Sequence, residues 1–355
     1  MPFAAPAETL HESPAQGTRA IATRMIISRT PFRVSFFGGG SDYPRWFQEH
    51  GGSVLAATID KYCYISVRKL PPFFDHRFRV VYSVVENVRE VREIAHPAVR
   101  AVLEWMQVDT GLEIHHDGDL PARAGLGSSS AFTVGFLNAM HALEGRRLSP
   151  DDLAAKAIHI EQIVLQESVG SQDQISAAFG GFNHITFRRD GSFQVNPAIV
   201  PPGRVDALQD HLMLLFTGIS RTAAEVAAVT IDNLARCGDR LQTMAAMVET
   251  SLDILSSARA DIVDFGRLLH ESWMIKRSLN HRVSNPTIDD LYEAARQAGA
   301  VGGKLLGAGG GGFLLLLVRP EDRARVRERL GRLIEVPFRF ESSGSRVVLY
   351  QPDGL

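Results

Sequence analysis

The sequence predicts an α+β protein of two domains, and three features lead to this prediction. The chain has 355 residues, of which 45% are hydrophobic, so it can bury two cores. Strand-like segments alternate with segments of helical periodicity, without internal repeats. Prolines at 197, 201 and 202 mark a linker, which predicts domains over 25–200 and 201–355. Residues 1–24, with Ala, Pro, Glu and Ser, are expected to be a flexible extension.

The first half is expected to start with strands and to continue with helices. Residues 54–69 are rich in β-branched and aromatic side chains, which favour a strand. The segment 150–167 has apolar residues at 153, 157, 160 and 164 with Asp151 in its first turn, which predicts a helix. The other elements expected here are strands at 25–35, 77–82, 112–116 and 182–187, and helices at 96–106, 132–143 and 174–179.

The second half is expected to be mainly helical around a few strands. The apolar run 312–318 is long enough for a buried strand and far too short to span a bilayer. A glycine-rich loop precedes it. The remaining expected elements are a strand at 211–216, helices at 222–257, 262–278, 288–297 and 321–333, and closing strands.

Charge and cysteine content exclude several classes of function. The 38 Lys and Arg residues nearly balance the 40 Asp and Glu residues and form no basic block, which argues against nucleic acid and anionic membranes as partners. Cys63 and Cys237 fit neither a disulfide framework nor a zinc pattern. The N-terminus lacks the apolar core of a signal peptide. We therefore expect a soluble, cytoplasmic protein.

The segment Pro121-Ala-Arg-Ala-Gly-Leu-Gly-Ser-Ser-Ser-Ala131 is the most informative stretch of the chain. Its glycines allow backbone N–H groups to converge, and the helix expected after it adds a positive dipole end. This pattern predicts a polyphosphate cradle. Mg²⁺ normally accompanies polyphosphate, and Ser128, Ser129 and Ser130 offer oxygen ligands. The alternative is a serine-capped helix after a glycine turn.

Two further segments fit the same chemistry, Thr30-Pro-Phe-Arg-Val-Ser-Phe-Phe-Gly-Gly-Gly-Ser-Asp-Tyr43 and Lys304-Leu-Leu-Gly-Ala-Gly-Gly-Gly-Gly-Phe313. The three segments, in this order, resemble the signature set of the GHMP small-molecule kinases over about residues 25–350. Within that family, the first segment, Val169–Gln174 and the helix with Trp273 and Lys276 are similar to bacterial sugar-1-kinases that act on D-glycero-D-manno-heptose 7-phosphate.

The resemblance implies a fold and a set of nucleotide contacts. It implies an N-terminal mixed-sheet domain of ribosomal protein S5 domain 2-like topology, a ferredoxin-like C-terminal domain, and an active site between them. ATP and Mg²⁺ are the implied cofactors. Ser129 and Glu161 are the implied magnesium ligands, with Glu167 as a competitor for the second position. The implied ATP-binding residues are Pro121, Ala124, Gly125, Leu126, Gly127, Ser128, Ser129 and Ser130.

The resemblance also assigns catalytic residues. Asp173, in Gly170-Ser-Gln-Asp-Gln174, matches the acidic residue beside the acceptor hydroxyl and is the expected general base or orienting anion. Its alternative role is a helix N-cap. Arg33 matches the Lys or Arg next to that aspartate, where a cation steadies the developing alkoxide and phosphoryl charge. The alternative is a surface arginine on a strand.

The expected substrate follows from one departure from the family pattern. Galactokinases carry Gly-Glu-His-Thr-Asp-Tyr where this chain has Gly38-Gly-Gly-Ser-Asp-Tyr43, so galactose is disfavoured while Asp42 remains to accept sugar hydroxyls. The phosphate of a heptose 7-phosphate calls for a basic clamp, with candidates Lys276, Arg277, His281 and Arg282, some of which are otherwise a solvated helix face. The expected substrate-binding residues are Asp42, Tyr43, Gly39, Gly40, Gly309, Gly310 and Lys276.

Four functions are weighed on these grounds. The leading one is an ATP-dependent kinase that makes heptose 1,7-bisphosphate from a small-molecule sugar phosphate, with a homodimer left open. The second is a GHMP kinase for another sugar, such as fucose, or for a mevalonate-type alcohol. The third is an NAD-dependent oxidoreductase, because Gly307–Gly312 matches G-x-G-x-x-G, although a strand and not a helix is expected after it. The fourth is a catalytically silent homologue, which intact Arg33, Ser129 and Asp173 disfavour.

Overall fold

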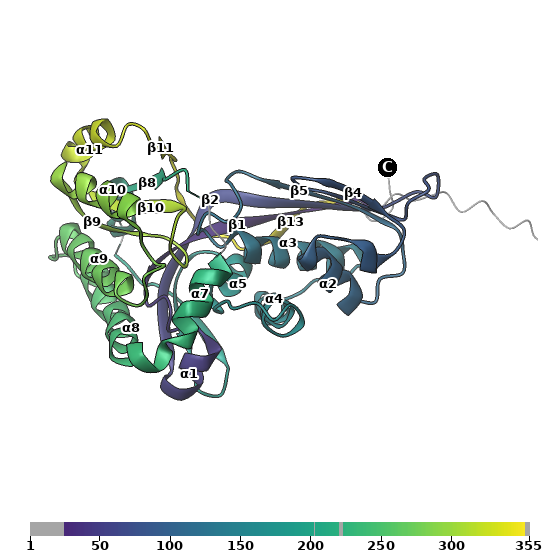
Figure 1. Cartoon of the computed structure of the whole chain (residues 1–355), viewed down its shortest axis with the longest axis horizontal. Coiled ribbons are helices and arrows are strands. Elements are labelled where there is room, and N and C mark those ends of the chain that lie inside the picture. The colour runs from purple at the N-terminus through teal and green to yellow at the C-terminus, as the bar shows by residue number, and fades with distance from the viewer. Residues whose placement is uncertain (1–24, 202, 220–222, 352–355) are drawn as a thin grey trace, which may run out of the picture.

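The computed structural model describes residues 25–201, 203–219 and 223–351, and the expected extension at 1–24 lies outside these ranges. Two sheets organise the described chain, one of nine strands and one of four. Helices cover one face of the larger sheet and surround the smaller one (Figure 1). The predicted α+β class is confirmed.

The larger sheet is built on two long neighbouring strands, β1 (Met25–Phe37) and β2 (Gly52–Lys69), which run antiparallel. Its main path has the order β13-β1-β2-β5-β3-β4, and β5 and β3 are parallel to each other. The first part of β2, residues 52–57, pairs with β6, and β6 pairs with β7. The other strands of this sheet are β3 (Phe78–Val81), β4 (Val85–Val88), β5 (Leu112–Gly118), β6 (Phe182–Phe187), β7 (Phe193–Pro197), β12 (Phe340–Glu341) and β13 (Arg346–Gln351).

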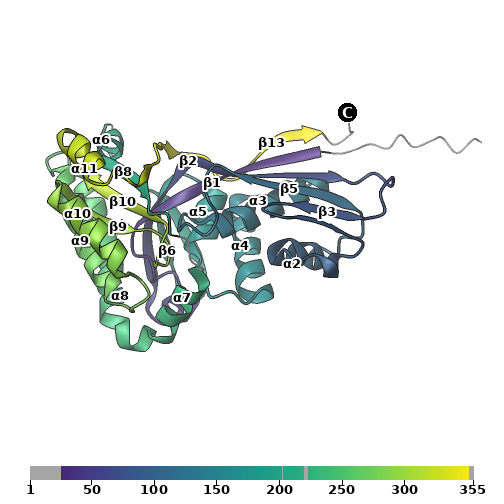
Figure 2. The same ribbon diagram turned by 45° about the horizontal axis from the view of Figure 1, so that its top comes forward.

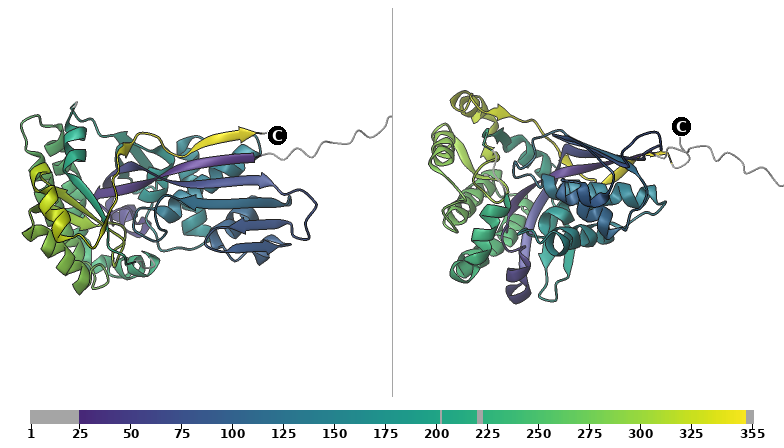
Figure 3. Two further views of the ribbon diagram at one scale, coloured as in Figure 1. Left: turned by 90° about the horizontal axis from the view of Figure 1, so that it is seen from above. Right: turned by 45° about the vertical axis from the view of Figure 1, so that its right-hand side comes forward.

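Four helices lie under the larger sheet, which Figure 3 shows from above. Helix α3 is buried along most of its length because apolar and small residues occupy all of its sides. It packs against β1 and β2. It begins directly after the loop 119–127, which contains the glycines of the predicted polyphosphate cradle and is called the phosphate loop below. The predicted helix 150–167 ends early, since a π-helical turn, His159–Val164, follows α4. The helices are α2 (Pro97–Trp105), α3 (Ser128–Leu143), α4 (Pro150–Ile158) and α5 (Gln172–Phe179).

The smaller sheet is antiparallel, with the order β11-β8-β10-β9. The glycine loop 306–312 joins β9 to β10, and α9 packs along β9. Its strands are β8 (Leu212–Phe216), β9 (Ala300–Leu305), β10 (Phe313–Val318) and β11 (Ile334–Glu335). The remaining helices are α1 (Pro44–His50), α6 (Arg204–His211), α7 (Ala223–Asp232), α8 (Leu234–Ser256), α9 (Ile262–Arg277), α10 (Pro286–Gln297) and α11 (Arg323–Arg329).

The two sheets are joined by an apolar contact and by the returning chain. The ring of Phe265 on α9 lies 5.5 Å from that of Phe36 and 5.0 Å from that of Phe37, both at the end of β1. After β11 the chain crosses back, and β13 pairs with β1 at the edge of the larger sheet (Figure 2). The domain boundary at residue 200 stays a prediction. The last two strands, β12 and β13, lie beyond it in sequence but belong to the larger sheet.

Candidate active site

The phosphate loop connects β5 to α3 and is held against β1. Gly125 and Gly127 have positive φ angles of 83° and 73°, which only glycine adopts without strain. The backbone N–H of Arg33 donates to Leu126 O at 3.1 Å. The first N–H groups of α3 therefore open at the end of a rigid turn, as an anion site requires.

The C-terminal glycine loop packs directly on the phosphate loop. A Cβ on Gly307 would lie 2.5 Å from the Cα of Gly125, and one on Gly312 would lie 2.3 Å from Ala124 O. Phe313 N also donates to Ala124 O at 3.2 Å. Because β10 follows this loop, the alternative of a dinucleotide-binding strand-loop-helix is wrong.

Arg33 and Asp173 form a two-point ion pair next to the phosphate loop. Arg33 Nε donates to Asp173 Oδ1 and Nη2 donates to Oδ2, both at 2.7 Å, and Nη1 donates to Gly125 O at 2.7 Å. A Cβ on Gly127 would lie 3.3 Å from the Arg33 side chain and 3.4 Å from Asp173 Oδ2. Arg33 is not a surface arginine, because only 4% of it is exposed. Asp173 is not the N-cap of α5, because Ser171 occupies that position.

Asp42 connects the first glycine segment to the start of α5. Its Oδ1 accepts from Gly40 N at 2.9 Å and its Oδ2 from Gln172 N at 3.3 Å, while Asp42 O accepts from Ser171 N at 3.1 Å. The carboxyl of Asp42 is buried, and this burial raises its pKa. The hydrogen bond from the Gly40 N–H acts in the opposite direction and lowers the pKa. Asp42 thus positions the helix turn that carries Asp173, and contact with sugar hydroxyls stays a prediction.

Two lysines lie at this site, of which Lys304 is buried and Lys276 is half-buried. Lys276 Nζ donates to Leu305 O at 3.1 Å and to Gly307 O at 2.5 Å, which ties α9 to the glycine loop. Burial, with the Arg33 charge, lowers the pKa of Lys276 to about 7. Lys304 Nζ donates to Ser35 O at 2.9 Å and Phe36 O at 2.7 Å. Burial holds the pKa of Lys304 well below its usual value.

Lys304 was missed as a site residue, although it opens the third sequence segment. Besides Lys276, three residues were predicted as candidates to bind the substrate phosphate, and they differ in exposure. Arg277 pairs with Asp289 at 2.7 Å, whereas His281 and Arg282 are exposed. Gly310 N donates to Val283 O at 2.9 Å, so the residues before Val283 lie beside the glycine loop.

The predicted magnesium ligands are only partly brought together. Glu161 is buried, and its Oε2 accepts from Ser130 Oγ at 2.9 Å and from Gln174 Nε2 at 2.5 Å. Burial raises the pKa of Glu161 to about 7. Ser129 is exposed, so the serine that touches Glu161 is Ser130. Glu167 is half-buried and donates its N–H to Glu161 O at 2.9 Å.

The other predicted site residues have mainly structural contacts. Tyr43 packs against a buried cluster around Trp46, and burial raises the pKa of its phenol. A Cβ on Gly309 would lie 2.6 Å from Val283 O, so this glycine permits close backbone approach. Pro121 is exposed at the start of the phosphate loop. Their predicted contacts with ATP or substrate stay predictions.

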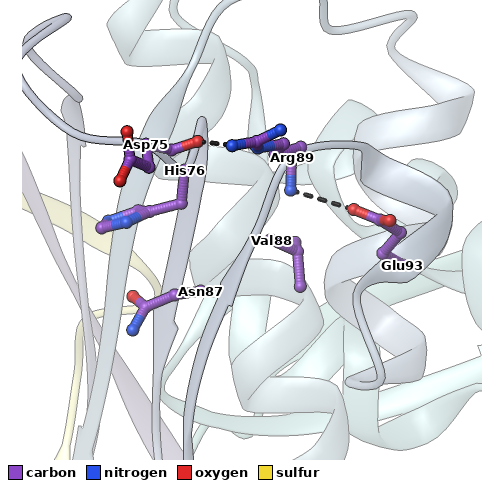
Figure 4. A pocket seen from close by; sticks show the side chains of 6 residues that line it. All are labelled: Asp75, His76, Asn87, Val88, Arg89 and Glu93. Atoms are coloured by element: carbon purple, nitrogen blue, oxygen red, sulfur yellow. Dashed lines mark hydrogen bonds between the residues drawn. The ribbon is translucent and has the colours of Figure 1, made fainter.

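A surface pocket of about 400 Å³ lies elsewhere, at the end of the β3–β4 hairpin (Figure 4). It is lined by Asp75, His76, Asn87, Val88, Arg89 and Glu93. Because β3 runs parallel to β5, these residues lie beside the start of β5, and the phosphate loop leaves its other end. This pocket is separate from the candidate active site.

Comparison with known proteins decides the family. The models for the GHMP kinases N terminal domain and the GHMP kinases C terminal match residues 84–181 and 254–335. The chain is 30% identical over 326 residues to a mevalonate kinase of Thermococcus onnurineus, covering 85% of this chain and 91% of the relative. The chain belongs to the GHMP kinase family. It is therefore an ATP-dependent phosphotransferase with an alcohol group as acceptor.

Other GHMP kinases are similar over most of their length. A D-glycero-alpha-D-manno-heptose 7-phosphate kinase of Campylobacter jejuni is 29% identical over 319 residues, covering 86% of this chain and 93% of the relative.

Two solved structures share the GHMP kinase fold. A D-glycero-D-manno-heptose 1-phosphate kinase of Bacteroides thetaiotaomicron has a TM-score of 0.68 at 24% identity, covering 91% of this chain and 99% of that one. A Lactococcus lactis galactokinase complexed with galactose has a TM-score of 0.69 at 18% identity, covering 91% and 95%. The predicted two-domain GHMP fold is thus confirmed.

Across the described residues, none of the helices combines the length and apolar character needed to cross a bilayer.

Proposed function

We propose that this GHMP kinase phosphorylates the anomeric hydroxyl of D-glycero-D-manno-heptose 7-phosphate, giving the 1,7-bisphosphate for nucleotide-activated heptose synthesis. The similarity to the Campylobacter jejuni kinase over 86% of the chain supports this substrate. So does the glycine pair at 39 and 40, which leaves more room than the Glu-His pair of galactokinases.

One observation carries the catalytic part of the proposal, the ion pair of Arg33 and Asp173 beside Gly127. Asp173 accepts the proton of the acceptor hydroxyl as its oxygen attacks the γ-phosphorus of ATP. The bond from the γ-phosphorus to the bridging oxygen breaks, and ADP leaves. Arg33 holds the carboxylate in place and offsets the charge that develops on the transferred phosphoryl group.

The start of α3 is proposed to bind the phosphates of ATP. Its N–H groups lack partners within the helix, and its dipole favours an anion. One feature of the site suits a magnesium ion. The buried Oε1 of Glu161 has no hydrogen-bond partner in the described structure, so this oxygen is available as a metal ligand. Glu161 with Ser129 or Ser130 would hold the ion. Magnesium would neutralise phosphate charge during transfer.

His281 and Arg282 are proposed to bind the phosphate of the substrate. Both are exposed and directly precede Val283, whose backbone O accepts from Gly310 N of the glycine loop. Arg277 is paired with Asp289, and Lys276 donates to the carbonyls of Leu305 and Gly307. A guanidinium is suited to a phosphate dianion. Arg282→Gln should therefore raise KM for the sugar phosphate and leave KM for ATP unchanged.

The deciding experiment compares acceptors in an ATP-consumption assay, with ³¹P NMR of the product. The panel is D-glycero-D-manno-heptose 7-phosphate, L-fucose, D-galactose and mevalonate. We expect the heptose phosphate to have by far the highest kcat/KM and to yield an anomeric phosphate. Better turnover of fucose or mevalonate would assign the protein to the second candidate function, which similarity to an Arabidopsis thaliana fucokinase (26% identical over 346 residues) and to the archaeal mevalonate kinases supports.

Cellular location and assembly complete the proposal. Cys63 and Cys237 are free and buried, which suits a reducing cytoplasm where ATP is available. A homodimer stays a prediction.

A further inference from the structure

Two buried polar groups beside Gly39 are not used by the protein itself. Ser35 is 6% exposed, and its Oγ has no hydrogen-bond partner among the described residues. The same is true of the buried Oε1 of Gln172, at the first position of α5. A buried hydroxyl or amide without a partner costs stability, so such groups in a native protein point to a ligand or to ordered water.

The Ser35 hydroxyl and the Gln172 carboxamide, the latter through its Nε2, lie close to the same point. A Cβ built on Gly39 would lie 3.6 Å from Ser35 Oγ and 3.6 Å from Gln172 Nε2, with no closer neighbour. These are ordinary contact distances, so protein atoms do not fill the space in front of Gly39 between the hydroxyl and the carboxamide. A ligand hydroxyl in van der Waals contact with Gly39 on this side lies between the two side chains, and a rotation of either side chain brings it within hydrogen-bond distance.

The backbone on both sides of this position is fixed. Lys304 Nζ donates to Ser35 O and Phe36 O, at the irregular end of β1 where the pairing with β2 shifts register. On the other side, Gln172 N donates to Asp42 Oδ2. The backbone that carries both side chains is therefore fixed before a ligand arrives, which lowers the cost of binding.

We propose that Ser35 and Gln172 bind a ring hydroxyl of the sugar and so select polyhydroxylated acceptors over simple alcohols. This inference rests on the proposed function, since it names further contacts of the same acceptor site. Gln172 directly precedes Asp173 on α5, and adjacent helical side chains diverge by about 100°. A ring whose reacting hydroxyl lies at Asp173 can therefore present a neighbouring hydroxyl beside Gly39.

The two side chains would also discriminate between acceptors that have a hydroxyl at this position and acceptors that lack one. The two groups together offer donors and acceptors to a hydroxyl, and they gain nothing from a methylene at that position. A site that hydrogen-bonds a substrate hydroxyl discriminates strongly against an analogue that lacks it, because its polar groups are then left unpaired.

The test uses Ser35→Ala, Gln172→Leu and the double variant, with Ser176→Ala as the matched control. Ser176 also has a buried Oγ without a partner in the described structure, but it lies one turn further along α5. For each protein, KM and kcat are measured for ATP and for whichever member of the acceptor panel the wild type uses best. Melting temperature is measured with and without that acceptor.

We expect each single variant to raise KM for the sugar about three- to tenfold, with KM for ATP unchanged. The melting temperature without sugar should stay the same or rise, because an unpaired polar group is removed, while the sugar-induced increase should shrink. Ser176→Ala should leave KM for the sugar unchanged.

The outcomes separate this inference from the proposed function. If fucose is the best acceptor and the variants weaken its binding, the heptose assignment fails and the role of Ser35 and Gln172 stands. An unchanged KM for the best acceptor overturns the inference whichever sugar it is. Mevalonate as the best acceptor, or no phosphorylation and no thermal shift with any sugar, overturns both.

Discussion

Arg33 and Asp173 lie 140 residues apart in sequence, yet two parallel hydrogen bonds of 2.7 Å join them beside the phosphate loop. Arg33 is nearly buried on β1, and 26% of the Asp173 side chain remains exposed. The guanidinium thus fixes the carboxylate without covering it. A third bond, from Arg33 Nη1 to Gly125 O, fixes the phosphate loop to the same group.

Arg33→Lys should lower kcat about 10- to 100-fold, because an ammonium holds a carboxylate at one point and leaves Gly125 O without its donor. KM for ATP should change less than kcat. Steady-state kinetics with both substrates checks this. A variant with wild-type kcat would show that the two-point geometry is not needed.

Glu161→Gln should raise the stability of the metal-free protein above pH 7. Burial raises the Glu161 pKa to about 7, above the value near 4.3 in the unfolded chain, so wild-type stability falls as the pH rises from about 4.3 to 7. The glutamine variant lacks this loss. Thermal unfolding at pH 4 and pH 8 in EDTA measures it, and equal pH dependence in both proteins would contradict it.

The same variant tests the magnesium site. Glu161→Gln should weaken the activation of the enzyme by Mg²⁺ about 10- to 100-fold. Ser129→Ala should also impair the use of Mg²⁺-ATP without a change in stability, because Ser129 is exposed. Titration of activity with Mg²⁺ at fixed ATP gives both values. If neither variant changes the titration, the two predicted ligands are wrong.

Lys276→Met should change how stability depends on pH. Burial lowers the Lys276 pKa to about 7, below the value near 10.4 in the unfolded chain. Between these values the unfolded chain binds the extra proton, so this lysine makes wild-type stability rise with pH from about 7 to 10. The free-energy difference between wild type and variant should rise over this window and stay flat below pH 6.

Urea unfolding at each pH measures that difference. Lys69→Met, at the end of β2, serves as the control for loss of a lysine. A difference between wild type and Lys276→Met that is independent of pH would contradict the account.

The sequence predicted elements whose signal is local. The apolar pattern of 54–69 and 262–278 gave β2 and α9 almost to the residue. It missed β9, because Gly302 and Gly303 hide the strand pattern. Glycine is needed there, since a Cβ on Gly302 would lie 1.9 Å from Gly266 O of α9. The pairing of β13 with β1 joins residues more than 300 positions apart, which no local pattern indicates.

The site divides in the same way. Arg33, Asp173 and the phosphate loop stand in short motifs whose order was informative, and the structure brings them together. It also shows that Ser130 faces Glu161, which three adjacent serines could not reveal because each helical step turns by about 100°. The roles of Lys276 and Lys304 depend on carbonyl groups reached only through the tertiary fold.

The central claim is that Asp173 acts on the acceptor hydroxyl, and Asp173→Asn tests it most directly. Asparagine keeps the size of the side chain and one hydrogen bond to Arg33, but it removes the negative charge. We predict that kcat with the best acceptor falls by about two to four orders of magnitude, while ATP affinity and the folded structure persist. The measurement is kcat under saturating ATP and acceptor, alongside the ATP dissociation constant and the melting temperature. Near-wild-type kcat in a folded, ATP-binding variant would contradict the account.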